Sequence, residues 1–301
     1  MEMIETFLEY YRKAKMMQEL KFEGASYAKE DIDDDLIWNV PIYDVVNRKY
    51  AAFSSLLEAL HLREKDPKGN GINFPNSYKI SKNDFIYLCY LFRLCGSGIN
   101  YKPKTNQPWG THGFGNFWIV DLLKKEIFEY DQWIYFLPEN KFCDVKGYML
   151  PMIKDGLRNF IVNESKYLIC HIKDFVLKSK NVGIKEIVDY GNEWLTKRGF
   201  MRQNFVLTAF AMDLAEYFPE HVDRDSDVYI GSNAKKCLKL ILPNMKQDKA
   251  IRYLCDITGN FSKPYDMEDV ACDFIRYLDN FQSTYHISTN NNLKYTNNVH
   301  K

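Results

Sequence analysis

The sequence lacks any hydrophobic run long enough to cross a membrane, and it carries no net charge. Its 301 residues include 40 Lys or Arg and 40 Asp or Glu. No apolar stretch approaches the ~20 residues that a membrane-spanning helix needs. The first residues are acidic and amphipathic, which is not the pattern of a signal peptide. We therefore expect an intracellular, cytoplasmic protein that has no membrane partner.

Several motifs that would identify a function class are also missing. The seven cysteines are scattered and odd in number, which fits a reducing compartment better than a disulfide framework. There is no C-x-x-C or H-E-x-x-H pattern, so no metal site is predicted. The G-x-x-x-x-G-K-[ST] loop is absent as well, which argues against ATP-driven phosphoryl transfer of that type.

The balanced charge bears directly on nucleic-acid binding. Domains that bind DNA through its backbone tend to be basic, and the formal net charge here is +0. The balance therefore weakens a nucleic-acid function without excluding it, because a local basic face is enough.

Few segments alternate in the manner of strands, and no internal repeat is visible, so the sequence predicts a mainly α protein. Residues 1–282 are expected to form one helical domain, because no linker rich in Pro, Gly or Ser divides them. Residues 283–301 are polar and Asn-rich and predict a disordered tail. Residues 95–116 have little regular pattern, and residues 131–152 could form a strand or a helical piece. Helices are predicted over 1–22, 41–62, 85–94, 117–130, 156–179, 184–195, 203–218, 246–257 and 267–281.

The most informative segment runs from residue 185 to 238. Two strongly periodic helices flank the break Arg198-Gly199-Phe200, where glycine can adopt positive φ at little cost. Lys197, Arg198 and Arg202 supply positive charge beside Gly199, so this hairpin is a candidate DNA contact. An acidic turn follows the second helix.

That turn carries Asp223, Asp225 and Asp227. A carboxylate at the mouth of a cleft can act as a base or stabilise a developing cation, which makes Asp223 and Asp225 candidate catalytic residues. A solvated turn is the other interpretation, because Asp is common in turns and at helix caps.

The loop after residue 93 is a second candidate site. Arg93 is followed by Gly96-Ser97-Gly98 and Asn100, and His112 lies in a further glycine-rich stretch. Backbone amides freed by glycine can form an anion-binding nest, and arginine can bind phosphate through two donors. The structural alternative is a helix cap at Gly96 followed by an ordinary loop.

Two further candidates are more general. Asp269, Asp273 and Arg276 fall on neighbouring turns of one predicted helix, where ion pairs on a solvated face are the usual outcome. Arg48 follows an apolar run and could point into a cleft. Either feature alone is typical of many proteins.

Taken in order, these segments resemble a known family. The matching pieces are residues 43–48, residues 93–100, the helix over 205–213 with Gly231-Ser232-Asn233-Ala234, and residues 269–277. The set is similar to phage DNA base-hypermodification proteins, the α-glutamyl/putrescinyl thymine pyrophosphorylases or amino acid:DNA transferases, with related hydroxymethyluracil-DNA kinases. That family is itself similar to helix-hairpin-helix DNA glycosylases, in which a carboxylate lies several helical turns beyond the hairpin. The resemblance implies a mainly α fold over residues 1–282, with two helical lobes and a central cleft between them.

The resemblance implies a transferase whose partners are DNA and an amino acid or polyamine. A hydroxymethyluracil base that carries pyrophosphate would be flipped from the duplex, and the amine would displace the pyrophosphate at the exocyclic methylene carbon. Asp223 or Asp225 would assist the amine, and a set of four residues would hold the pyrophosphate: Arg48, Arg93, Ser97 and His112. No cofactor is required by this scheme, although a divalent cation could accompany the pyrophosphate. In a phage-encoded protein the reaction would take place in the host cytoplasm.

Three alternatives stay open. A glycosylase would need the same acid and cleft but no anion nest, and would leave abasic sites. A kinase acting on hydroxymethyluracil in DNA would consume ATP, which the missing nucleotide-binding loop disfavours. A noncatalytic DNA-binding or partner-binding protein would tolerate substitution of Asp223 and Asp225 by Asn.

Overall fold

The fold was analysed in a computed structural model, which describes residues 3–39, 43, 45–50, 57, 63–65, 72–75, 80–94, 99–101, 108–111, 117–137 and 156–279. The described part is mainly helical, as the sequence predicts. The N-terminal and central helices are α1 (Met3–Gln18), η1 (Glu19–Glu23), α2 (Lys29–Ile32), α3 (Asp35–Asn39), η3 (Arg48–Tyr50), α5 (Lys82–Leu94), α6 (Phe117–Lys124) and α7 (Tyr130–Tyr135). The later helices are α9 (Gly156–Asn163), α10 (Ser165–Lys178), α11 (Ile184–Lys197), α12 (Asn204–Tyr217), α13 (Ser232–Ile241), α14 (Gln247–Ile257) and α15 (Pro264–Leu278).

The described strands form three two-stranded sheets. The first two are antiparallel: β1 (Arg63–Lys65) with β2 (Ile72–Pro75), and β3 (Ile99–Tyr101) with β4 (Pro108–Thr111). The third is a short parallel pair, β5 (Val182–Gly183) with β6 (Val222–Asp223). The β3–β4 hairpin falls within the stretch that the sequence predicts to be irregular.

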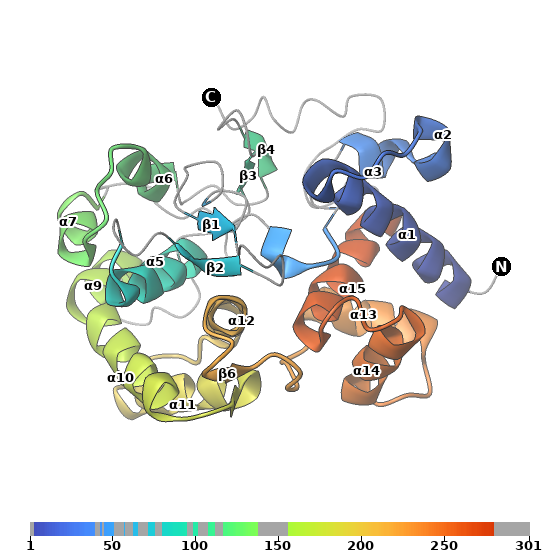
Figure 1. Cartoon of the computed structure of the whole chain (residues 1–301). Helices are drawn as coiled ribbons and strands as arrows, with labels where there is room; N and C mark the ends of the chain where they lie inside the picture. Colours follow the sequence, from blue (N-terminus) through green and yellow to red (C-terminus); the bar gives the residue numbers. More distant parts are fainter. Residues whose placement is uncertain are drawn as a thin grey trace.

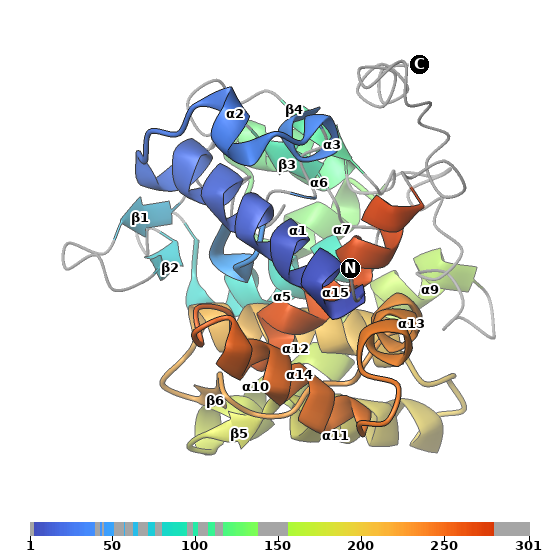
Figure 2. The same ribbon diagram turned by 90° about the vertical axis from the view of Figure 1, so that its right-hand side faces the viewer.

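The buried hydrophobic side chains gather in two clusters, which we call the first and second cores. The first core joins α5 to α7 and α9 to α12, and the second joins α1 to α3 with α13 to α15. Figure 1 shows these two groups of helices side by side, with α12 and α15 facing each other between them. Figure 2, turned by 90°, shows α1 crossing above α13 to α15. Residues 45–50 link the two groups near the centre of the molecule.

Helix α12 is central because nearly all of its surface is apolar. Eleven of its fourteen residues are buried, which is the pattern of a helix enclosed on all sides rather than one lying on a surface. It packs against α11 on one side and α5 on the other. Asp213 and Glu216 are also among its buried residues, and buried carboxylates need partners.

The hairpin between α11 and α12 forms where the sequence predicts it. Gly199 has φ +82, and a Cβ added there would meet nothing within 4 Å. Glycine is therefore favoured at position 199 because the backbone needs a positive φ, and not because a side chain would clash. Gly191 has the opposite role, because an added Cβ would lie 2.8 Å from Cδ1 of Ile172, so glycine here lets α10 and α11 approach closely.

The helix predicted over residues 41–62 is interrupted at residues 45–50. Val46 and Asn47 lie in a bend and the short 3-10 helix η3 follows them, whereas Leu57, further along the same range, is helical. The reason is that side chains distant in sequence bind the backbone N–H groups here. Oε1 of Gln18 accepts from Val46 and Asn47, and Oδ1 of Asp266 accepts from Arg48.

Two other predicted helices are interrupted. The helix predicted over 117–130 is split between α6 and α7, with Glu126 at φ 57 between them. The helix predicted over 156–179 is divided at Glu164 into α9 and α10. The predicted tail over 283–301 lies outside the described residues. In the part of the chain that can be described, no helix has the length and apolar character needed to cross a membrane.

Candidate functional site

Two arginines and one aspartate meet between the two cores. Asp213 of α12 accepts a hydrogen bond from Nε of Arg48 at 3.1 Å through Oδ1. The same carboxylate receives two bonds from Arg93, from Nε at 2.6 Å and from Nη2 at 2.8 Å. All three side chains are at least nine-tenths buried. One carboxylate thus joins α12, α5 and the segment around residue 48.

Asp269 of α15 completes this group, which we call the junction cluster (Arg48, Arg93, Asp213 and Asp269). Its Oδ2 accepts from Nη1 of Arg48 at 2.5 Å, and its side chain is 43% exposed. Nη2 of Arg48 donates to the backbone carbonyl of Ala209. Burial disfavours the charged guanidinium of Arg48, but Asp213 and Asp269 outweigh that effect and raise its pKa. Asp269 is the one member of the cluster that reaches solvent.

The start of α15 brings two more carboxylates to the same place. Asp266 accepts from the backbone N–H of Arg48 at 2.6 Å and of Lys263 at 2.8 Å. Burial, together with the charge of Glu216, raises the pKa of Asp266 to about 7. Glu268 accepts from the backbone N–H of Gly231, and burial beside Asp269 raises its pKa to about 8. Groups with such shifts gather at functional sites more often than elsewhere.

Glu216 extends the network along α12. Its Oε2 accepts from the hydroxyl of Tyr265 at 2.8 Å and from Nη2 of Arg224 at 2.9 Å. Nε of Arg224 in turn donates to the hydroxyl oxygen of Tyr265. Asp213 and Glu216 are three residues apart and so share one face of α12. That face is directed toward α15, and each of its two carboxylates is matched by arginine.

The acidic turn does not face the arginines of the junction cluster. Asp223 accepts the backbone N–H of Asp225, which fixes the turn itself. Asp225 is bound to Lys263 at 2.8 Å with 66% of its side chain exposed, and Asp227 is bound to Arg252. Asp223 and Asp225 are thus bonded to the turn itself and to the residue before α15, whereas Asp213 and Asp269 are the carboxylates bonded to the arginines of the junction cluster.

The cations of the predicted DNA-contacting hairpin each have a local partner. Lys197 is bound to Glu193, and Arg202 to Asp189. The guanidinium of Arg198 lies 4.1 Å from the ring centre of Trp194. The two ion pairs are half exposed or more, and such pairs contribute only about 0–1 kcal/mol, so a phosphate could replace them.

The remaining predicted site residues lie on α15, in the β3–β4 hairpin or outside the described residues. Asp273 and Arg276 bind each other at 2.7 Å on α15. The backbone of Asn100 pairs with Gly110 in the β3–β4 hairpin. Ser97 and His112 lie outside the described residues. Within the described ranges, no group of three or more His, Cys, Asp or Glu side chains could hold a metal ion.

Sequence reasoning did not identify five residues of this network: Glu216, Arg224, Tyr265, Asp266 and Glu268. Asp266 stands at the third position of α15, and its side chain accepts from the backbone N–H of the N-cap residue Lys263. One signal was available. Asp213 and Glu216 are the two acids in an otherwise apolar helix, and an acid in that context has to be paired when it is buried.

Comparison of the chain with family models, with curated proteins and with solved structures gives no significant match.

Proposed function

We propose that this protein is a transferase that attaches an amino acid or polyamine to a pyrophosphorylated hydroxymethyluracil base in DNA. The observation that carries the proposal is the convergence of four separated segments. Arg48, Arg93, Asp213 and Asp269 belong to the four stretches on which the family resemblance rests, and they form one cluster. The helix beginning at Ser232 adjoins it through the bond from Gly231 to Glu268.

Asp269 replaces Asp223 and Asp225 as the proposed reactive carboxylate. It is the exposed end of the junction cluster and is bound to Arg48. A carboxylate can accept a proton from an incoming ammonium group and stabilise positive charge that develops on the methylene carbon. The free amine then forms the nitrogen–carbon bond as the carbon–oxygen bond to pyrophosphate breaks. The product nitrogen is a secondary ammonium, and the carboxylate passes the proton it accepted to the departing pyrophosphate or to water.

Arg93 is the better candidate of the two arginines for binding pyrophosphate. Arg48 uses all of its guanidinium nitrogens on Asp213, Asp269 and Ala209. Arg93 uses Nε and Nη2 on Asp213, and no described residue accepts a bond from its Nη1. Ser97 and His112 stay predicted partners for the same anion, because they follow Arg93 in the glycine-rich stretch.

Mass spectrometry of nucleosides tests the proposal. The protein would be incubated with duplex DNA containing the pyrophosphorylated base and a pool of amino acids and polyamines, and the DNA would then be digested. We expect a nucleoside whose mass has gained one amine donor. Intact, folded protein that yields no adduct would refute the transferase, and abasic sites in its place would identify a glycosylase.

Two variants locate the reactive carboxylate. Asp269→Asn should lower the rate of adduct formation by about 100-fold, the usual loss when one transition-state electrostatic contact is removed. Asp121→Asn is a matched control, because Asp121 is an exposed carboxylate on α6, in the other group of helices. A larger loss in Asp225→Asn than in Asp269→Asn would return the role to the acidic turn.

A further inference from the structure

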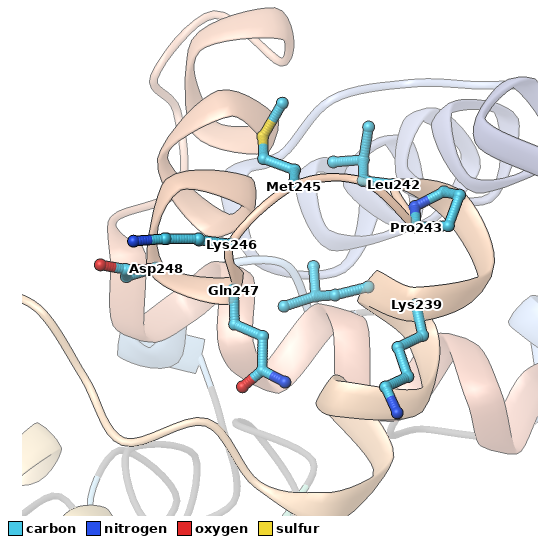
Figure 3. Close-up of a pocket in the computed structure, with 8 residues that line it drawn as sticks. Lys239, Leu242, Pro243, Met245, Lys246, Gln247 and Asp248 are labelled. Atoms are coloured by element: carbon cyan, nitrogen blue, oxygen red, sulfur yellow. The ribbon is translucent and has the colours of Figure 1, made fainter.

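The α13–α14 unit concentrates positive charge in a chain that has none overall. Residues 232–257 contain six Lys or Arg and two Asp, a net charge of +4, whereas the whole chain has 40 of each sign. A hollow of about 440 Å³ lies where the two helices meet, and Lys239 and Lys246 are among the residues that line it. Figure 3 shows the side chains of Lys239 and Lys246 extending away from the ribbon in different directions.

Among the residues that the structure describes, the lysines of this unit have no carboxylate partner, whereas most other cations do. Lys235, Lys236 and Lys239 are exposed on α13, and Lys246 and Lys249 are exposed at the start of α14. Within the described part of the chain, none of the five forms an ion pair. Elsewhere, Lys197, Lys263 and Arg202 are all bound to acids. Unpaired positive charge on one unit is what a polyanion would neutralise.

The basic surface lies on α13. The opposite side of α13 packs against α15, the helix that carries Asp269 of the junction cluster. Ala234, Cys237, Leu238 and Ile241 form the buried side of α13, which packs along α15. Lys235 and Lys239 are one turn apart and lie opposite that buried side. Gly231, just before α13, binds Glu268 next to Asp269. Lys235 therefore lies about 6 Å along the helix axis from Gly231, at 1.5 Å per residue.

The chemistry of the surface favours a nucleic-acid backbone over a membrane. A helix that lies on lipid needs an apolar face to bury in it, and the apolar face of α13 is already used in the second core. The exposed residues of α13 are three lysines with Ser232 and Leu240, so a single leucine is the apolar side chain that α13 could offer to lipid. Lysine at several points along one helix can contact successive phosphates as point charges, without reading the bases.

We propose that the outer face of α13, with the turn into α14, binds the phosphate backbone of duplex DNA. We call this face the α13 basic face (Lys235, Lys236, Lys239 and Lys246). It would hold the strand that leads to Asp269. The proposal rests on the proposed function in naming DNA as the polyanion, and it places the main backbone contact away from the hairpin at Gly199.

The test measures binding of a fluorescent duplex oligonucleotide without a modified base, by anisotropy over a series of salt concentrations. The variant is Lys235→Ala, Lys236→Ala, Lys239→Ala, in which alanine preserves helix propensity. Its control is Lys125→Ala, Lys178→Ala, Lys180→Ala, which removes the same charge from exposed positions of the other group of helices. We expect the α13 variant to bind the duplex at least about tenfold more weakly. The slope of log binding constant against log salt concentration should become shallower by about 0.9 for each phosphate contact removed.

Three results would overturn the proposal: equal losses in the two triple variants, no loss in the α13 variant, or binding of the wild type to phosphatidylserine vesicles but not to DNA. Lys246→Ala is a single-residue check and should lower the slope by about one contact. The nucleoside assay tests the transferase proposal independently of this binding measurement. Loss of DNA binding in the α13 variant, with no adduct from the wild type, would refute the transferase and leave the α13 basic face supported.

Discussion

The junction cluster and the acidic turn contain similar numbers of charged residues but differ in what holds them. In the junction cluster, Asp213 is 2% exposed and binds two buried arginines from distant segments. In the acidic turn, Asp225 is 66% exposed and binds Lys263 on the molecular surface. A dense run of acids in the sequence therefore does not mark the place where a charged side chain contributes most to the stability of the fold.

The difference follows from the surroundings of each carboxylate. Water stabilises Asp225 whether or not Lys263 is present, so the pair contributes little. Asp213 is buried and is not solvated by water. Removing its charge leaves the guanidinium groups of Arg48 and Arg93 buried without their main partner. The same reasoning separates candidate catalytic residues from ordinary surface charges, because charge–charge interactions are much stronger between groups that are shielded from water.

The strongest way to test this contrast is to substitute Asp213. Asp213→Asn keeps the shape of the side chain but removes the charge that both Arg48 and Arg93 need. We expect the free energy of unfolding to fall by about 3–5 kcal/mol, the range seen when one partner of a buried ion pair is lost. Chemical denaturation measures this change directly.

Asp225→Asn is the matched substitution in the acidic turn and should cost no more than about 1 kcal/mol. If the two variants lose similar stability, the contrast between the junction cluster and the acidic turn is wrong. If Asp213→Asn is too unstable to purify at 25 °C, unfolding of the wild type and of Arg93→Met can be compared instead. The arginine variant leaves Asp213 with Arg48 and should be milder than Asp213→Asn.

The second test uses pH. Burial beside Asp269 raises the pKa of Glu268 to about 8, above its ordinary value of about 4.3. Between those two values the folded protein keeps a proton that the unfolded chain has released, so stability is greatest below the lower value and is lost as the pH rises toward 8. The slope of this loss is at most about 1.4 kcal/mol per pH unit.

Glu268→Gln should flatten this part of the stability curve, because a neutral amide can accept from Gly231 without titrating. The equivalent acid-to-amide substitution in the acidic turn, Asp227→Asn, should leave the dependence of stability on pH unchanged over the same pH range. Denaturation midpoints at several pH values from 5 to 8.5 provide the measurement. A wild-type curve that rises over this interval would mean that Glu268 is ionised in the fold.

Much of the helical architecture could be predicted from the sequence, while the junction cluster could not. The apolar spacing of residues 184–195 and 203–218 predicts α11 and α12, and Gly199 predicts the break between them, because these signals are local. The cluster depends on pairs such as Arg48 with Asp269, which are 221 residues apart. The interruption at residues 45–50 of the helix predicted over 41–62 has the same cause, since Gln18 and Asp266 bind the backbone there from a distance.

A third and smaller effect should come from Tyr265. Its hydroxyl donates to Glu216 and accepts from Arg224, so Tyr265→Phe removes two bonds but leaves the Glu216–Arg224 pair. We expect a loss of about 1–2 kcal/mol in unfolding free energy, because a hydrogen bond to a charged group is involved. Tyr229→Phe is the exposed counterpart, since its hydroxyl binds Asp189 at the surface, and should lose less. Equal losses would show that burial does not strengthen this network.

The smallest expected effect concerns the pair between Asp225 and Lys263, which are 2.8 Å apart. A double-mutant cycle with Asp225→Asn and Lys263→Met isolates their interaction, and we expect about 0.2–1 kcal/mol at low salt. Raising the salt to 1 M shortens the screening length to about 3 Å, so the interaction energy should fall further. Yet Lys263 also donates its backbone N–H to Asp266, which joins the surface of the turn to the buried start of α15. A coupling that stays above about 1 kcal/mol in 1 M salt would therefore show that the acidic turn helps to hold Asp266 in place, and the two regions would have to be treated as one unit.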